Sequence, residues 1–514
     1  MAKKMFEQNE WGFDLDKTNP FWVALYNLRE VAQDSVGEEN VLDLSRGDPG
    51  YGFAPNVASR EFYSFLLFLD LIFNNFERHF VHDKSNWIAL RQEIETKTRE
   101  NFSPEVAVRH LQNFDLFISQ ILRITRDQDL GWDERKILFE IFKYANVSGG
   151  RYHDPQGEEI CRAVVADFYS RQLSEHIVAD DLVFMRGVSD GIGTFFQLMD
   201  EREGIGFLQA GDTVVTASPA YAPYNLIFKN RGLNVLSIEF DPATGEVERA
   251  SLQKIKEFSG QIKVFCLIDP NNPTGFAIDE GFKMELVEIA EKQNAIILTD
   301  EVYFSFLRGA RSVFSLAPHR TLRLDARSKI ERSTGLRFGD FLIPEKTNKF
   351  LSESILADFL PSGVDLKRAI TLAKAPGGTK GEFMHVTFVA GPSQFLGICH
   401  IIFGEAERKK YVAMVQDNVK EFANILGIAK DSNNYYTSFD LNAIANESKK
   451  SLPAEEKFFQ LAKRGVVLIP GNLFFSNEKR AAADCRNFAR ACLPNLTFAN
   501  IQKAANVIKD FLQS

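Results

Sequence analysis

The sequence predicts an α/β protein with a mainly parallel sheet, a smaller α+β domain and a helical insert. From about 150 to 340, short β-rich runs alternate with helical stretches, an order typical of parallel sheets covered by helices. Stripes of phenylalanine at helical spacing precede this region, and a mixed helix and strand pattern follows it. The expected segments are 1–54 joining the small domain, 55–145 as the insert, 146–404 as the large domain with a second insert at about 341–390, and 405–514 as the small domain.

The insert is expected to contain at least two helices. Ser59 is placed to cap a helix that runs to about Phe80, with apolar residues at three- and four-residue steps. A second helix is expected after Ser103, because Pro104 suits the first helical position. Core packing explains these phenylalanine stripes best. A ligand pocket and a subunit interface are the alternatives.

The later elements are read from the same two periodicities. The large domain is expected to have strands at Asp212–Thr216, Ile262–Ile268 and Ala295–Thr299. A helix is expected at Glu280–Gln293, between the last two strands. The small domain is expected to hold a helix, a strand and a last helix at Glu405–Leu426, Gly465–Ile469 and Ala499–Leu512. Sites on parallel sheets form at the carboxyl ends of strands, so chemistry is expected where these strands end.

Composition narrows the class of function. The 514 residues are 45% apolar and 25% charged, with a net charge of −9, which indicates no nucleic-acid or membrane partner. The amino terminus lacks the apolar run of a secretory signal, and five scattered cysteines suggest no disulfide framework. The histidines and acidic residues are not spaced as the ligands of a metal site would be. We expect a cytoplasmic enzyme that acts on small molecules.

Three motifs stand in a fixed order along the large domain. Asn272-Pro273-Thr274-Gly275 comes first and Asp300-Glu301-Val302-Tyr303 second, each after a strand-like run. Ser328-Lys329 comes third, with Arg337 eight residues beyond the lysine. By itself the first motif is also a common turn and the lysine a common surface cation. The order of all three carries the interpretation.

Together these motifs resemble those of the class I and II aminotransferases, which use pyridoxal 5'-phosphate. The resemblance implies a fold-type I transferase with a mainly parallel, seven-stranded sheet. It also implies that Lys329 forms the Schiff base with the cofactor and moves the substrate α-proton. Asp300 would face the ring nitrogen of the cofactor, and Asn272 and Tyr303 would bind its phenolic oxygen.

The resemblance also places the remaining cofactor contacts. The phosphate would lie on the turn Gly187-Val188-Ser189-Asp190-Gly191, where Val188 and Ser189 open a helix, and against Ser328 and Arg337. Tyr221 matches the aromatic residue over the cofactor ring, although a core tyrosine would look the same. Tyr152 matches the residue that reaches the phosphate of a neighbouring subunit, which implies a homodimer or a larger homo-oligomer.

The substrate contacts follow from the same resemblance. Arg486 falls near the position of the arginine that binds the substrate α-carboxylate, and Arg490 could compete for that role. Gly47 matches a glycine of the substrate cleft. Arg46 is a candidate for the second carboxylate of a dicarboxylic substrate, or else a salt-bridged surface residue.

Chain length and insert positions resemble those of the aspartate 4-decarboxylases, which also transaminate aspartate. This implies action on L-aspartate or a similar amino acid, with a 2-oxo acid as the possible acceptor, by transamination, β-decarboxylation or both. The alternatives are an aminotransferase for another amino acid and a non-catalytic protein that binds partners through its inserts.

The lysine segment departs from the family in two ways. Ala326 stands where the family usually has serine or glycine, three residues before Lys329, and this predicts a weaker hold on the phosphate. The following segment, Ile330-Glu331-Arg332-Ser333, is more charged than is usual for the wall of a buried cofactor.

Overall fold

The computed structural model describes residues 20–49, 57–72, 87–144, 153–307, 309–374, 388–428, 435–475 and 486–514. The chain divides into two compact units, each made of separate stretches of sequence. Unit 1 comprises Met1–Phe53, Gly206–Arg323 and Lys410–Ser514, and unit 2 comprises Ala54–Ile205 and Leu324–Lys409. The division into four segments expected from the sequence stays a prediction.

A seven-stranded sheet has the strand order β2-β8-β7-β6-β5-β3-β4. Pairs β3–β4, β3–β5 and β5–β6 are parallel, whereas β2–β8 is antiparallel. This confirms the α/β class with a large, mainly parallel sheet. The strands are β2 (Leu182–Met185), β3 (Thr213–Ser218), β4 (Asn234–Glu239), β5 (Ile262–Ile268), β6 (Ile296–Asp300), β7 (Thr321–Ala326) and β8 (Gly339–Leu342).

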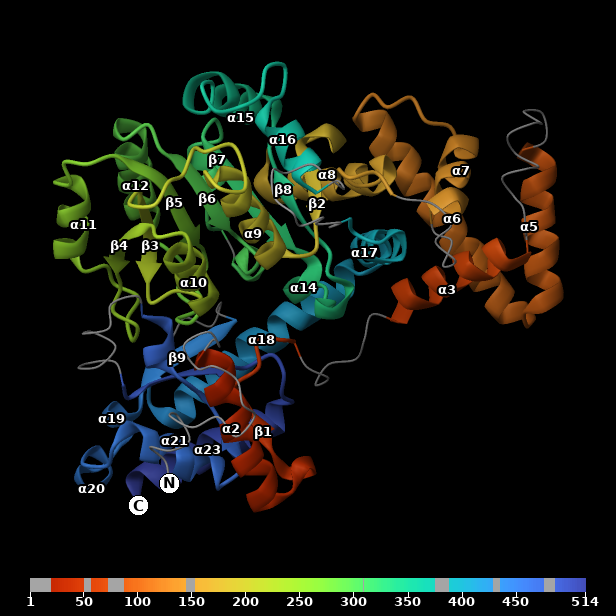
Figure 1. The fold of residues 1–514 in the computed structure, drawn as a ribbon. Coiled ribbons are helices and arrows are strands. Elements are labelled where there is room, and N and C mark those ends of the chain that lie inside the picture. The colour runs from red at the N-terminus through yellow and green to blue at the C-terminus, as the bar shows by residue number, and fades with distance from the viewer. Residues whose placement is uncertain are drawn as a thin grey trace. The chain divides into compact units, whose positions relative to one another are not determined.

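Helices accompany the parallel strands of unit 1, because a parallel neighbour can be reached only by a crossover. In Figure 1, α11 and α12 are drawn beside the sheet strands of this unit. Their apolar faces and the inward side chains of β3 to β6 form one buried core that includes Val215, Phe265, Leu286 and Ile297. These helices are α10 (Ala222–Asn230), α11 (Arg249–Lys256), α12 (Glu280–Lys292) and α13 (Val313–Leu316).

The remainder of unit 1 is an α+β arrangement. An antiparallel sheet has the order β11-β12-β9, and β1 pairs in parallel with β10. The single strand expected at Gly465–Ile469 is instead two short strands, because Leu468 separates β10 from β11. The elements are α2 (Pro20–Val36), β1 (Leu42–Asp43), α18 (Glu405–Leu426, which begins in unit 2), β9 (Tyr436–Asp440), α19 (Leu441–Ile444), α20 (Glu447–Lys450), α21 (Ala454–Ala462), β10 (Val466–Val467), β11 (Ile469–Pro470), β12 (Phe488–Cys492) and α23 (Phe498–Gln513).

Unit 2 is rich in helices. The expected insert contains the first four of them, which are drawn together in Figure 1. The helices are α3 (Val57–Ile72), α5 (Trp87–Asn101), α6 (Pro104–Asp127), α7 (Glu134–Tyr144), α8 (Glu159–Leu173), α9 (Val188–Met199), α14 (Arg327–Ile330), α15 (Glu345–Phe350), α16 (Leu366–Ala373) and α17 (Gly391–Phe403).

The capping expectation for Ser59 is wrong. Ser59 lies inside α3, where its hydroxyl donates to the carbonyl of Cys399 at 3.1 Å instead of capping the helix. Helix α6 does begin at Pro104, but the Ser103 side chain makes no capping hydrogen bond. The predicted continuation of the first helix from Phe73 to Phe80 lies outside the described residues.

The phenylalanine stripes are core, as expected. Phe62, Phe65, Phe114 and Phe117 are each at most 1% exposed. The Phe62 ring lies 5.0 Å from that of Phe117 and 4.8 Å from that of Phe403, on α17. The insert therefore shares its apolar interior with α17, within the same unit.

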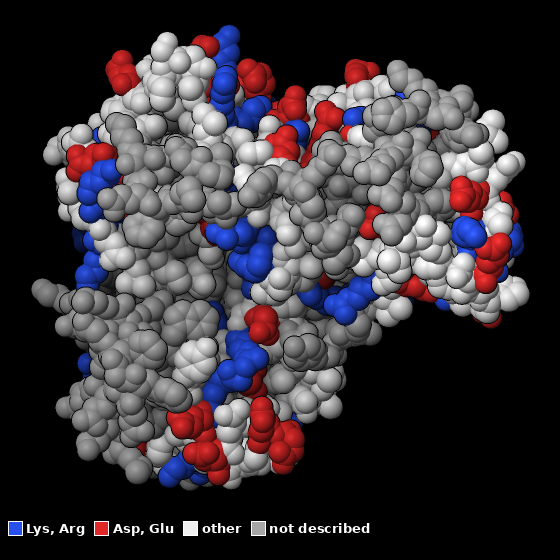
Figure 2. Space-filling view, turned by 45° about the vertical axis from the view of Figure 1, so that its right-hand side comes forward, with Lys and Arg blue, Asp and Glu red and all other residues white. Residues whose placement is uncertain are grey.

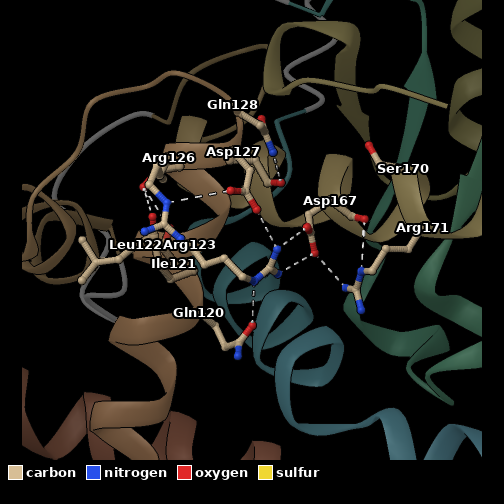
Figure 3. Close-up of polar contacts among 12 residues, drawn as sticks. Gln120, Ile121, Leu122, Arg123, Arg126, Asp127, Gln128, Asp167, Ser170 and Arg171 are labelled. Carbon is tan, nitrogen blue, oxygen red and sulfur yellow. Dashed lines mark hydrogen bonds and ion pairs between the residues drawn. The ribbon is translucent and has the colours of Figure 1, made fainter. Parts of the chain in front are cut away.

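Polar contacts fix the insert to α8 (Figure 3). Arg123 of α6 binds the Asp167 carboxylate of α8 through two nitrogens, at 3.0 and 3.2 Å. Arg171 binds the same carboxylate at 2.8 Å, and Gln128 donates to the carbonyl of Ala163 at 2.8 Å. Because the Asp167 side chain is only 12% exposed, this pairing is better shielded than an ordinary surface salt bridge.

Charged side chains of both signs lie on the surface of the described residues (Figure 2). Figure 2 shows acidic and basic side chains interspersed on the right-hand part of the visible face. No helix among the described residues is long and apolar enough to cross a membrane. Nor does any group of three or more potential ligands among those residues suit a metal ion.

Lys374 provides a pH-dependent contribution to the stability of unit 2. Its amine donates to the carbonyl oxygens of Pro155 (2.6 Å) and Phe184, and burial lowers its pKa to about 7. Between this value and the ordinary lysine pKa, the unfolded chain binds a proton that the native protein does not. Stability must therefore rise with pH from about 7, by up to about 1.4 kcal/mol per pH unit.

We expect the melting temperature of the wild type, relative to that of Lys374→Met, to increase between about pH 7 and pH 9. The variant serves as the control because it lacks the titrating amine but fills a similar volume. Thermal unfolding of both proteins across this range provides the measurement. A difference that stays constant with pH would show that Lys374 is charged in the native protein throughout.

Candidate active site

Asp300 is the last residue of β6 and is 4% exposed. One carboxylate oxygen accepts the amide hydrogen of Val302 at 3.1 Å, and the other accepts the hydroxyl of Tyr224. Burial, followed by the charge of Asp300, raises the pKa of Tyr224 well above its ordinary value. Tyr224 therefore keeps its proton, and its hydroxyl donates a hydrogen bond to the Asp300 side chain at the end of β6.

Tyr303 follows Asp300 by three residues and is also buried. Its hydroxyl shares a hydrogen bond of 3.0 Å with the hydroxyl of Tyr436 on β9. Burial raises the pKa of Tyr303 well above its ordinary value, and Tyr436 raises it further, so both phenols are protonated. A Cβ on Gly47 would lie 2.5 Å from the Tyr436 hydroxyl, so a larger residue at this position would require Tyr436 to shift.

Asn272 and Arg490 are in direct contact. The guanidinium of Arg490 donates to the side-chain oxygen of Asn272 at 3.1 Å and to the carbonyl of Ser45 at 2.5 Å. It also lies over the ring of Tyr436, at 4.5 Å from the ring centre. Unit 1 thus brings Asn272, Tyr303 and Gly47 to one cluster, with Arg490 and Tyr436 at its centre.

The geometry favours Arg490 over Arg486, the arginine preferred from the sequence. Arg486 is exposed, in the turn before β12. Arg490 lies within β12 and is 2% exposed. A buried, oriented fork can bind a carboxylate with little loss of side-chain entropy, whereas an exposed arginine must give up more freedom. The assignment of the α-carboxylate arginine to Arg486 stays a prediction, with the buried Arg490 as its competitor.

For Arg46 and Tyr221, the structure is compatible with both interpretations made from the sequence, a functional contact and an ordinary structural one. Arg46 is exposed and pairs with Asp43 at 3.4 Å, but Arg29 binds the same carboxylate oxygen more closely, at 2.9 Å. Tyr221 is the residue before α10, and its ring is nearly perpendicular to that of Tyr224, 5.4 Å away. Neither residue is fully buried.

Buried ion pairs involve Asp269 and Glu301, in the loops that follow β5 and β6 and lie next to Asn272 and Asp300 in sequence. Glu301 binds Arg323 at 2.7 Å, and both side chains are inaccessible to solvent. Asp269 binds Lys283 at 2.5 Å with similar burial. Breaking such a pair leaves an uncompensated buried charge, so each pair holds its loop firmly.

In unit 2, an exposed guanidinium lies over the start of a helix. Gly187 precedes α9 with φ of +87°, and a Cβ there would approach Nη2 of Arg337 to 2.7 Å. Arg337 donates to the carbonyls of Arg186 (2.9 Å) and Thr334 (3.0 Å). Val188 is buried and Ser189 exposed in the first turn of α9. Free amide hydrogens at a helix start beside a guanidinium form a suitable cradle for a phosphate.

Lys329 lies in the same unit, within the four-residue helix α14 that follows β7. It is partly exposed, whereas Ser328 is 6% exposed. The hydroxyls of Ser333 and Thr334 donate to the carbonyls of Arg327 (2.9 Å) and Ser328 (3.2 Å). These hydrogen bonds form a closed turn, which restrains the backbone between Lys329 and Arg337.

Two residues of the site, Tyr224 and Tyr436, were not predicted from the sequence. Tyr224 follows Tyr221 by three residues, a helical step that could have indicated it. Tyr436 has no local signal, because its role depends on contacts with distant parts of unit 1. Tyr152 lies outside the described residues, so its predicted role stays a prediction.

The fold and these residues define the chain's class. The family description "Aminotransferase class I and II" matches residues 136–508. The chain therefore belongs to this family of pyridoxal-phosphate-dependent enzymes, and it is an enzyme, not the non-catalytic protein considered as an alternative. Within unit 2, the turn at Gly187 beside Arg337 has the donors that a phosphate needs, and within unit 1, Asp300 is a buried carboxyl group at the end of β6.

Curated relatives share the enzyme class. A bifunctional aspartate aminotransferase and L-aspartate beta-decarboxylase from Pseudomonas is 24% identical over 442 residues, covering 77% of this chain and 79% of its own. An aspartate aminotransferase from Thermotoga maritima is 26% identical over 227 residues, covering 42% of this chain and 56% of its own.

Solved structures share the fold. An aminotransferase from Mycobacterium tuberculosis superposes with a TM-score of 0.63 at 18% identity, covering 97% of this chain and 98% of its own. A double mutant of the Thermus thermophilus aspartate aminotransferase gives a TM-score of 0.59 at 16% identity, covering 95% and 96%. These similarities confirm a fold-type I aminotransferase architecture.

Proposed function

We propose that this enzyme acts on L-aspartate, by transamination, by β-decarboxylation to alanine and carbon dioxide, or by both. The observation that carries the proposal is the similarity over most of both chains to the bifunctional Pseudomonas enzyme, whose two named activities share aspartate. The buried Arg490 fork, placed against Asn272, provides the carboxylate site that any amino-acid substrate needs.

Pyridoxal phosphate, when bound, supplies an aldehyde for amines and a ring that stores the electrons left at the substrate α-carbon. Gly187, Val188, Ser189, Ser328 and Arg337 would hold its phosphate. Asp300 would keep the ring nitrogen protonated, because a buried carboxylate stabilises a neighbouring cation. Tyr303 and Asn272 would donate to its phenolic oxygen, and Tyr221 would lie against its ring.

Lys329 would act on the proton of the substrate α-carbon. Lys329 is partly exposed, and the turn that carries it is closed by internal hydrogen bonds. Its backbone is therefore held in place while its amine can reach a substrate. A positioned amine that removes a proton and returns it to a neighbouring atom is general acid–base catalysis. Replacement of either Ser333 or Thr334 would make the backbone at Lys329 less restrained.

Arg46 is proposed to bind the distal carboxylate of aspartate. Asp43 is bound more closely by Arg29 than by Arg46, so Arg46 can leave this contact while the Asp43 charge stays paired. Exposed ion pairs contribute little, and the exchange for a substrate carboxylate therefore has a small cost. Gly47, next in sequence, leaves room beside Tyr436.

We further propose a cytoplasmic homodimer. Tyr152 matches a family residue that reaches the neighbouring subunit's phosphate, and this supports the dimer. Cys161, Cys266, Cys399 and Cys492 are buried free thiols, which suits a reducing compartment. A 2-oxo acid is the expected amino acceptor.

The test is incubation of the cofactor-loaded protein with L-aspartate, with and without 2-oxoglutarate. Carbon dioxide, alanine, oxaloacetate and glutamate are measured, and other amino donors are compared at equal concentration. Alanine with carbon dioxide would establish β-decarboxylation, and glutamate with oxaloacetate would establish transamination. If another donor reacts and aspartate gives none of these products, the aspartate assignment is wrong.

A further inference from the structure

Two buried ionic residues bracket Lys329. Arg327 opens helix α14 and is 1% exposed, and Glu331 follows the helix and is 3% exposed. Neither belongs to the predicted cofactor contacts. Burying a charge is costly unless it is paired, so the partners of both residues show what the charges achieve.

Arg327 is held by α8 and by the strands on either side of its turn. Its Nη2 donates to the hydroxyl of Tyr169 at 2.7 Å, and that hydroxyl donates to Asp340 at 3.0 Å. Nη2 also pairs with Asp325 at 3.1 Å, and the guanidinium lies over the ring of Phe168, 4.8 Å away. Within the described residues, Nε and Nη1 of Arg327 make no hydrogen bond. The hydrogen bond to the Tyr169 hydroxyl therefore contributes much of the orientation of this guanidinium.

Glu331 is held from another side. Arg408 of α18 binds its carboxylate at 2.8 Å and donates to the carbonyls of His400 (2.7 Å) and Ile401 (3.1 Å) near the end of α17. The Arg408 guanidinium also lies 5.5 Å from the centre of the Phe168 ring. The charges that looked unusual in the sequence are therefore paired with helices of the same unit.

Helix α8 is itself a fixed support. Residues two positions apart point to nearly opposite sides of a helix, so Asp167 and Tyr169 face different neighbours. Asp167 is bound by Arg123 of the insert and by Arg171, as Figure 3 shows. Tyr169, 0% exposed, is directed to Arg327. The insert thereby stabilises the helix against which the Lys329 turn is anchored.

We propose that Arg327 and Glu331, held by Tyr169 and Arg408, are positioning residues that fix the orientation of Lys329. An ion pair at each end of a four-residue helix restrains both its translation and its rotation. This inference rests on the proposed role of Lys329.

Tyr169→Phe tests the proposal, because it removes one oxygen and leaves the ring beside the guanidinium. Tyr63→Phe is the matched control, since the buried Tyr63 hydroxyl has no hydrogen-bond partner among the described residues. Both variants and the wild type are compared as cofactor-loaded proteins. The measurements are kcat, KM, the affinity of the cofactor-free protein for pyridoxal phosphate, and the midpoint of the visible absorbance change with pH.

We expect Tyr169→Phe to lower kcat by about ten- to a hundredfold, as for the loss of a hydrogen bond to a charged group, with little change in KM. The absorbance midpoint should also shift, since the Lys329 nitrogen would be held less uniformly. Tyr63→Phe should match the wild type in all four measurements. If Tyr169→Phe lowers only the melting temperature, the network is merely structural and the proposal is wrong.

A second variant keeps the test decisive if Tyr169→Phe does not fold. Glu331→Gln removes the charge at the other end of the turn, and the same shift in absorbance midpoint is expected from it. Its absence in a folded Glu331→Gln protein would overturn the proposal. Borohydride reduction of the wild type, followed by peptide mass mapping, tests the role of Lys329 by itself. Label on a lysine other than Lys329 refutes that role, whatever the variants do.

Discussion

Lys329→Ala is expected to lose covalent attachment of pyridoxal phosphate and to lower turnover by about 10⁴-fold. The amine is expected both to hold the cofactor and to move the α-proton, and loss of a positioned general acid–base group alone costs up to about 10⁴-fold. The alanine leaves the turn intact, because the bonds from Ser333 and Thr334 end on backbone carbonyls, not on the lysine side chain.

The measurement combines two readouts. Borohydride reduction and peptide mapping report which lysine carries the cofactor, and product formation reports turnover. Lys346→Ala, an exposed lysine of α15 in the same unit, is the matched control and should behave as the wild type. A Lys329→Ala protein that is still labelled elsewhere and still turns over at the wild-type rate would contradict the assignment.

The sequence predicted those parts of the fold and site that depend on local pattern. Strand β5 was expected at Ile262–Ile268 and α18 at Glu405–Leu426, and the structure has both with these bounds. Strand β6 ends at Asp300, one residue beyond the expected strand, and the structure places this carboxylate in a buried contact with Tyr224. Period and residue type are sufficient where neighbours in sequence are also neighbours in space.

Long-range contacts were not predictable in this way. Tyr436 enters the cluster because β9 pairs with β12 and meets the segment around Gly47, a contact between residues almost 400 positions apart in sequence. The charged segment after Lys329 looked unsuited to a cofactor wall, because the partner of Glu331 is Arg408 of α18, which is distant in sequence. A charge is costly or stabilising according to its partner, and a single sequence does not show the partner.

The choice between Arg486 and Arg490 has the same origin. The two arginines are four residues apart, and both have the guanidinium fork that a carboxylate needs. Strand register gives the two arginines different surroundings. Arg490 pairs across β12 with Ser438 of β9 and with Ile469 of β11, in the middle strand of its sheet, whereas Arg486 precedes the strand.

Arg490→Lys is the second change with a large expected effect. Lysine keeps the charge but loses the planar fork, so the contacts with Asn272 and Ser45 and the bidentate grip on a substrate carboxylate are not kept together. Truncating one partner of a buried, hydrogen-bonded charge pair costs about 2–5 kcal/mol, so KM for the amino acid should rise by at least about thirtyfold. The carboxylate is bound alike before and during the reaction, and kcat should therefore change less than KM.

Arg486→Lys is the matched control, because it makes the same chemical change at an exposed position four residues away. Steady-state kinetics with L-aspartate and the inhibition constant for succinate, a dicarboxylate without an amine, separate binding from turnover. If Arg486→Lys raises KM and weakens succinate while Arg490→Lys does neither, the exposed arginine is the one that binds substrate. The buried Arg490 would then serve only to hold Asn272, and its loss should appear as altered cofactor absorbance with an unchanged succinate constant.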